Sequence, residues 1–263
     1  MHMPEATLVS QRPPQEARIQ PNDVFTFRCS KELDCFTLCC RNVSIVLTPY
    51  DVLRMKRALR LNSSEFLDKY TVAMNTRGKR LPVLILKMEG EQLQCPFVTQ
   101  EGCSIYRHRP WACRMYPLGL AEPRHPASGE AKFYFTLNEG GCHGHGKGEA
   151  CQAQSWIASQ ELEDYESMGA SFKELMLNEF WDQDVALPPE KMGMYLMACY
   201  DLDRFRRFIF ETSFLDRFEM DEARIEAIRT DDEELLEVAM EWLGFVLFGA
   251  KTMKLRKNSL PKG

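Results

Sequence analysis

The chain has 263 residues, enough for one globular domain or for one domain with an appendage. Its net charge of -5 disfavours the basic surface of a general nucleic-acid-binding protein. No apolar run reaches the roughly 18 residues that a membrane-spanning helix needs. The sequence therefore predicts a globular protein with no membrane partner and disfavours nucleic acid as a partner.

Residues 1–23 are rich in proline and polar side chains and lack the apolar centre of a secretory signal peptide. We expect a flexible arm here and a cytoplasmic protein. Because cytoplasmic thiols stay reduced, their clusters bind metal more often than they form disulfides.

A dense cysteine run follows, with the pattern C-x5-C-x3-C-C over Cys29, Cys35, Cys39 and Cys40. Adjacent cysteines form a badly strained disulfide ring, so four thiols in twelve residues are poorly explained by pairing. Thiolates held close together repel each other and need a cation, which makes zinc or iron the simplest explanation.

Short strands and two helices are expected next. The apolar segments 43–47, 81–88 and 132–137 are typical of strands. Thr48 and Asn62 each occupy a helix N-cap position with an acid three residues later, so helices should begin after both. Between and after these elements lie four more thiols, Cys95, Cys103, Cys113 and Cys142.

From residue 152 the spacing of apolar side chains becomes helical, with helices expected over 156–168, 171–181, 189–211 and 221–249. We therefore predict an α+β protein: an arm (1–23), a small cysteine-rich metal-binding domain with short strands and two helices (24–151), a helical C-terminal half packed on it (152–250) and a basic tail (251–263).

Eight thiols would suffice for two four-thiolate sites, or for one polynuclear site with bridging sulfurs. Grouping in space need not follow the chain, because adjacent Cys39 and Cys40 point in different directions. Zinc, iron and an iron–sulfur cluster all accept four thiolates, so the spacing leaves the metal open. Nearby arginines could offset the thiolate charge or could form ordinary surface ion pairs; they are Arg28, Arg41, Arg109 and Arg114.

Two further kinds of residue are weaker candidates. His143 and His145 flank Cys142 and could bind zinc, although solvated loop histidines are the favoured interpretation. Cys199 is expected to be a packed core thiol, and Cys151 a buried or inert one. Metal ions are the expected partners, and a protein partner stays open.

These motifs together resemble the YkgJ-like cysteine-cluster family, a zinc- or iron-chelating domain, over about residues 25–150. The likeness extends beyond the cysteines to Leu47–Asp51, Cys95–Phe97, Gly102–Tyr106 and Arg109–Pro117. One departure is the spacing of the first cysteines, since the commonest family opening is C-x2-C-x2-C-C. The resemblance implies metal binding through Cys29, Cys35, Cys39, Cys40, Cys95, Cys103, Cys113 and Cys142.

An enzyme is the alternative that the resemblance leaves open. Flagellin lysine N-methylases are similar in the same cysteine domain and are linked to an iron–sulfur cluster. An iron-dependent modification of a protein side chain is therefore the second hypothesis, with no catalytic residue assigned to it.

Overall fold

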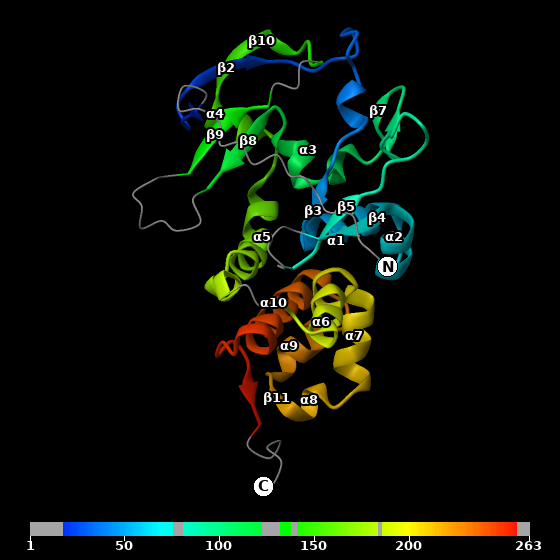
Figure 1. Cartoon of the computed structure of the whole chain (residues 1–263), viewed down its shortest axis with the longest axis vertical. Coiled ribbons are helices and arrows are strands. Elements are labelled where there is room, and N and C mark those ends of the chain that lie inside the picture. Colours follow the sequence, from blue (N-terminus) through cyan, green and yellow to red (C-terminus); the bar gives the residue numbers. More distant parts are fainter. Residues whose placement is uncertain (1–17, 76–80, 123–131, 138–140, 184–185, 257–263) are drawn as a thin grey trace. The chain divides into compact units, whose positions relative to one another are not determined.

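The computed structural model describes residues 18–75, 81–122, 132–137, 141–183 and 186–256 (Figure 1). The chain divides into two compact units. The cysteine unit comprises the described residues within 7–46 and 85–166, and the helical unit those within 47–84 and 167–263. Most of the predicted arm and about half of the predicted basic tail lie outside the described residues.

The cysteine unit consists of short strands joined by long irregular segments. Its elements are β1 (Arg18–Ile19), β2 (Val24–Phe27), β6 (Val98–Thr99), β7 (Gly102–Cys103), α3 (Trp111–Met115), β8 (Leu118–Ala121), β9 (Phe133–Thr136), β10 (His145–Gln152) and α4 (Ala153–Ser159). Within the described residues, 3-10 turns lie at Leu38–Cys40 and Tyr106–His108 in this unit and at Glu179–Gln183 in the helical unit. The strands form a β1-β9-β8 sheet, a β10-β2 ribbon and a β6-β7 hairpin.

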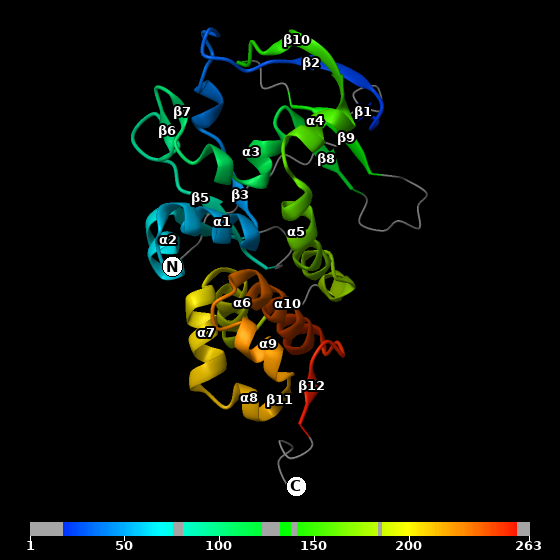
Figure 2. The same ribbon diagram turned by 180° about the vertical axis from the view of Figure 1, so that it is seen from behind.

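Strands β2 and β10 run side by side, as both ribbon views show (Figures 1 and 2), and pair antiparallel with Cys151 opposite Phe25. The register shifts between His145 and Ala150, so β10 bulges where it leaves the segment that carries Cys142. A small core lies beneath these strands, around Met115, Leu118, Tyr134, Ala153 and Leu162.

The helical unit contains most of the regular structure. Its elements are α1 (Pro49–Leu59), α2 (Ser63–Tyr70), β4 (Thr71–Met74), α6 (Pro189–Tyr200), α7 (Leu202–Glu211), α8 (Phe214–Arg217), β11 (Phe218–Glu219), α9 (Glu222–Ala227), α10 (Asp232–Phe248) and β12 (Lys254–Leu255). The chain crosses between the units within β3 (Val46–Leu47), β5 (Val83–Leu86) and α5 (Glu163–Met176).

Both predicted helix starts are confirmed. Thr48 caps α1 by accepting a hydrogen bond from the backbone N–H of Asp51, whose carboxylate accepts in return from the N–H of Thr48. Asn62 and Glu65 make the same reciprocal pair at the start of α2. Each pair satisfies two backbone donors that the first turn would otherwise leave free.

A buried lysine links α1 to the later helices of the helical unit. Lys56 is only 5% exposed, and its Nζ lies 3.2 Å from Asp203 Oδ2 and 3.1 Å from Asp232 Oδ2. The backbone N–H of Ser63 also donates to Asp203, at 2.6 Å. Removing one member of such a buried network leaves a charge without its partner, so these contacts specify how α1 and α2 pack against α7 and α10.

The predicted α+β fold with a helical C-terminal half is confirmed, and three predicted helices are each divided. The helix expected over 156–168 is divided between α4 and α5, and the helix expected over 171–181 begins within α5 and ends in the 3-10 turn Glu179–Gln183. The helix expected over 189–211 breaks at Asp201, whose carboxylate caps α7 at Arg204 N. The helix expected over 221–249 breaks between α9 and α10, with Asp231 as the cap of α10.

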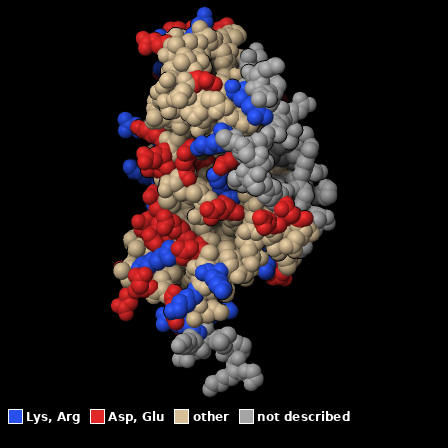
Figure 3. All heavy atoms as spheres, turned by 90° about the vertical axis from the view of Figure 1, so that its left-hand side faces the viewer, with Lys and Arg blue, Asp and Glu red and all other residues tan. Residues whose placement is uncertain are grey.

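Among the described residues, no helix has the length and hydrophobicity to span a bilayer. On the face seen in Figure 3, acidic and basic side chains are interspersed.

Candidate metal centre

All ten cysteines lie in described segments, and none of the ten is joined in a disulfide. The first thiol group comprises Cys29 and the three cysteines whose charges act on it, Cys35, Cys39 and Cys142. Cys29 is exposed as a residue, yet burial of its thiol raises its pKa, and so do the charges of its three neighbours in the group. Mutual repulsion of this kind is what a bound cation would relieve.

The second thiol group comprises Cys40, Cys95, Cys103 and Cys113. A hydrogen bond with the Cys39 thiol, burial, and the charges of Cys39, Cys113 and Cys95 raise the pKa of Cys40. Burial, together with the charge of Cys103, raises the pKa of Cys95. All four members are half-buried, whereas Cys29 and Cys39 of the first group are exposed.

The grouping in space thus differs from the grouping along the chain at two positions. Cys40, from the first run of cysteines, joins the later thiols, and Cys142 joins the earlier ones. Because Cys39 and Cys40 are neighbours whose thiols contact each other, they connect the two groups. The expectation that these adjacent cysteines serve different sites stays a prediction, because their thiols lie within hydrogen-bonding distance of each other.

Long-range backbone hydrogen bonds place Cys40 beside the later cysteines and Cys142 beside the earlier ones. The N–H of Cys95 donates to the carbonyl of Cys40 at 2.9 Å, which places Cys40 beside the second group. The N–H of Arg28 donates to the carbonyl of Gly144 at 3.1 Å, which brings Cys29 to the segment that carries Cys142. The antiparallel hairpin of β6 and β7, with Val98 opposite Cys103, holds the segment that follows Cys95 against Cys103.

Several sulfurs accept hydrogen bonds from the backbone. The N–H of His143 donates to Cys35 Sγ at 3.2 Å. The N–H groups of Phe97 and Val98 bond to the Cys95 thiol and oppose the rise of its pKa, as the N–H of Ile105 does at Cys103. Such donors stabilise thiolate, the form that binds metal, and tune the metal that it holds.

The thiols of each group lie near one another but not at the separations of ligands around one metal ion. Four sulfurs on one zinc ion lie about 4 Å apart, given zinc–sulfur bonds of about 2.3 Å. Within the described residues, Asp34, Cys35 and His143 are the one set of three potential ligands whose atoms all lie within 4.8 Å of one another. Coordination by either thiol group therefore requires its side chains to contract around the ion.

Arg109 is the arginine whose charge reaches the second group. Its side chain is buried, stacks on the Tyr106 ring and donates to Gln160 Oε1 at 2.7 Å. Burial lowers the pKa of Arg109, and the charges of Tyr106, Cys113 and Cys103 oppose that effect. A buried guanidinium beside thiolates offsets part of their negative charge.

The other three arginines have different partners. Arg114 donates to the carbonyl oxygens of Gln160 and Arg107 and lies over the Tyr165 ring. Arg41 bonds to Gln92, and the charge of Arg28 helps to lower the pKa of Glu32 after the larger effect of a hydrogen bond from Ser30. These contacts support the packing of loops.

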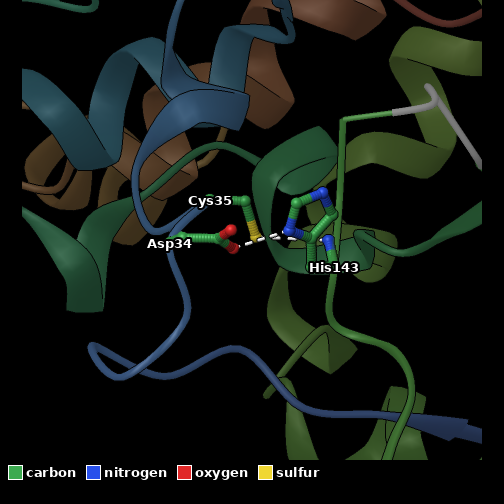
Figure 4. Close-up of side chains that lie close together, drawn as sticks. All are labelled: Asp34, Cys35 and His143. Atoms are coloured by element: carbon green, nitrogen blue, oxygen red, sulfur yellow. Dashed lines mark hydrogen bonds and ion pairs between the residues drawn. The ribbon is translucent and has the colours of Figure 1, made fainter.

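A histidine and a carboxylate lie against the first thiol group (Figure 4). Nδ1 of His143 is 2.6 Å from Asp34 Oδ1, and this hydrogen bond lowers the pKa of the Asp34 carboxyl. The sequence indicated His143 as a weak candidate and missed Asp34. No spacing signal could have found Asp34, because 109 residues separate it from the histidine.

The remaining candidates belong to neither group. His145 bonds through Nε2 to the carbonyl of Leu137 at 3.0 Å and packs on Phe27. Cys151 lies in β10, and Cys199 is fully buried in α6 of the helical unit, where burial raises its pKa. The interpretation of Cys199 as a packed core thiol accords with this position.

Comparison with known families agrees with the donor set. Residues 28–154 match the CxxCxxCC family, described as a "putative zinc- or iron-chelating domain". No curated protein and no solved structure matches the chain significantly. The matched segment contains both thiol groups, and the predicted resemblance is confirmed. Residues 28–154, just under half of the chain, thus match the CxxCxxCC cysteine-cluster family.

Proposed function

We propose that the cysteine domain binds zinc or iron at two four-thiolate sites, one in each thiol group. The observation that carries this proposal is the proximity of the thiols. The charges of Cys39, Cys142 and Cys35 act on Cys29, those of Cys39, Cys113 and Cys95 act on Cys40, and that of Cys103 acts on Cys95. Four thiolates form a complete ligand set for tetrahedral zinc, for a single iron ion or for an iron–sulfur cluster. The other potential ligands of the chain are not needed.

The surrounding residues fit such ions. Backbone N–H groups already point at the sulfurs of Cys35, Cys95 and Cys103, and a buried guanidinium, that of Arg109, lies beside the second group. Bound zinc would supply cross-links alone, whereas bound iron would also supply electron transfer. Both would bring together segments that have little regular structure.

Folding energy is a further argument for bound metal. The segments that carry the thiols contain two-residue strands, one five-residue helix and 3-10 turns. Such elements bury little apolar surface, so metal–thiolate bonds would stabilise the arrangement directly. We propose a structural or storage role for the ions on this ground.

Elemental analysis of the full chain, purified without oxygen, tests the proposal, and absorption spectra identify the metal. We expect two ions or two clusters per chain. The double variant C40S/C103S should lose one of them, because both residues belong to the second group. The double variant C29S/C40S should lose both, because its residues belong to different groups.

Other outcomes would contradict the two-site proposal. Sites that follow chain order would reverse the results for the two double variants. One polynuclear site would be lost in both of them. A full chain that binds no metal under these conditions would refute metal binding altogether.

The enzymatic alternative, an iron-dependent modification of a protein side chain, stays a prediction, as does the cytoplasmic location. Incubating the iron-loaded protein with candidate peptides and following their mass would test the first.

A further inference from the structure

Asp34, Cys35 and His143 together form a preassembled set of nitrogen, oxygen and sulfur donors. Their potential ligand atoms all lie within 4.8 Å of one another. Figure 4 shows the carboxylate and the imidazole turned toward the sulfur from two separate chain segments. Ligands of one zinc ion lie about 3 to 4 Å apart, given their bond lengths, so side-chain shifts of about 1 Å would close this trio on an ion.

The three residues differ in access to solvent. The side chains of Asp34 and His143 are 78% and 57% exposed, whereas Cys35 is only 7% exposed. An ion that comes from solvent can therefore meet the carboxylate and the imidazole before it meets the sulfur.

The donors suit a divalent transition metal. Imidazole, carboxylate and thiolate are all ligands of zinc and of iron(II), and three protein ligands leave a position for water. Nδ1 of His143 and Oδ1 of Asp34 now share a hydrogen bond, and a cation can take its place between the same two atoms. The backbone of His143 stays attached to Cys35 Sγ through its N–H.

Cys35 belongs to both sets, since its charge also acts on Cys29 of the first thiol group. We propose that Asp34, Cys35 and His143 form a loading site that captures a divalent cation and passes it to the first thiol group through the shared Cys35 sulfur. The transfer of the cation to the first thiol group rests on the proposed function, whereas the capture of the cation by the three residues does not. No equivalent trio lies beside the second group among the described residues.

Stopped-flow absorption with cobalt(II) as the probe tests the loading site on the metal-free full chain. Thiolate–cobalt charge-transfer bands report how many sulfurs bind. We expect a fast phase with few thiolates per ion, followed by a slower phase that ends in a four-thiolate spectrum. H143Q and D34N should lose the fast phase and slow the loading of one ion by about tenfold, an effect typical of residues that support a metal site.

Gln at position 143 keeps the backbone N–H that donates to Cys35, so the variant removes only the ring. E32Q is the matched control, because Glu32 is a fully exposed acid two residues from Asp34 and outside the trio. It should load as the unmodified chain does, and all three variants should end with two ions bound.

The results that would overturn the inference, in whole or in part, differ from one another. Loading of H143Q and D34N at the unmodified rate would show that the trio captures nothing. Loss of one ion from either variant at equilibrium would make its residue a permanent ligand. A chain that forms no four-thiolate spectrum would refute the proposed function, and with it the transfer. A four-thiolate spectrum with unchanged rates would refute the loading site alone.

Discussion

The backbone N–H of Cys95 donates to the carbonyl of Cys40 across 55 residues, at 2.9 Å. This bond joins the end of the first cysteine run to the start of the second. It places Cys40 beside the later cysteines, whereas Cys39 acts on Cys29 and also contacts the Cys40 thiol. Close backbone approach is thus a condition for both thiol groups.

The approach of Gly144 to Arg28 should control the first group. A Cβ at Gly144 would lie 2.7 Å from the Arg28 carbonyl oxygen and 2.9 Å from the Phe27 ring, so G144A must move the segment that carries Cys142. We expect a loss of about 2 kcal/mol in unfolding free energy, as for an overpacked site, and the loss of one of two ions.

Elemental analysis and denaturant unfolding measure both effects. G169A is the control, since a Cβ at Gly169 in α5 meets nothing within 4 Å. It should keep both ions. Full metal content in G144A would show that this approach does not position Cys142.

Metal binding should release protons and tighten as the pH rises. The pKa values of Cys40, Cys95 and Cys103 are all raised above that of an ordinary cysteine thiol, so we expect these thiols to be protonated in the metal-free chain at neutral pH. Coordination removes these protons, so we expect the second group to release about three protons for each ion that it binds. Lowering the pH should weaken binding for the same reason.

Calorimetry in buffers of different ionisation enthalpy counts the protons. Release of none near pH 7 would mean that these thiols do not become ligands.

Substitution of Arg109 should weaken metal binding, whereas substitution of Arg114 should lower the free energy of unfolding. R109Q removes a positive charge that lowers the pKa of Cys103, and we expect about tenfold weaker binding at the second group. R114Q removes donors to two backbone carbonyls, so it should cost about 2 to 3 kcal/mol in unfolding free energy with unchanged affinity.

Competition with a coloured chelator measures the affinity of each variant. Equal metal affinities for R109Q and the unmodified chain would show that the charge of Arg109 does not strengthen binding at the second group.

Cys199 should matter to packing alone. Its side chain is fully buried in α6 between Tyr195 and Tyr200, far along the chain from both thiol groups. C199A deletes one buried sulfur, and we expect a loss of about 1 kcal/mol in unfolding free energy, as for other small deletions in a core. Metal content should stay at two ions, and loss of an ion would mean that the ligand sets are drawn wrongly.

Local signals in the sequence predicted the local structure well. The starts of α1 and α2 follow from Thr48 and Asn62 because a capping box involves residues only three apart. The break at Asp201 was missed because apolar spacing continues through it. The carboxylate of Asp201 instead caps a new helix.

The candidate site was only partly accessible to sequence reasoning. Residue type and density predicted eight thiols as ligands, and this stays a prediction. Which of the thiols lie together depends on hydrogen bonds between residues far apart, such as Arg28 with Gly144. The contact between Asp34 and His143 has the same origin. The spacing of ligands in a chain limits which sites are possible, and the loops between them decide which sites form.

The grouping of residues 47–84 with the later helices has a practical consequence. A fragment cut to the family match would include α1 and α2 but not α6, α7 and α10, against which they pack. Its buried side chains, among them Leu53, Met55 and Phe66, would then face water, and Lys56 would lose both its carboxylates. Such a truncated protein should be insoluble whatever metal is offered to it.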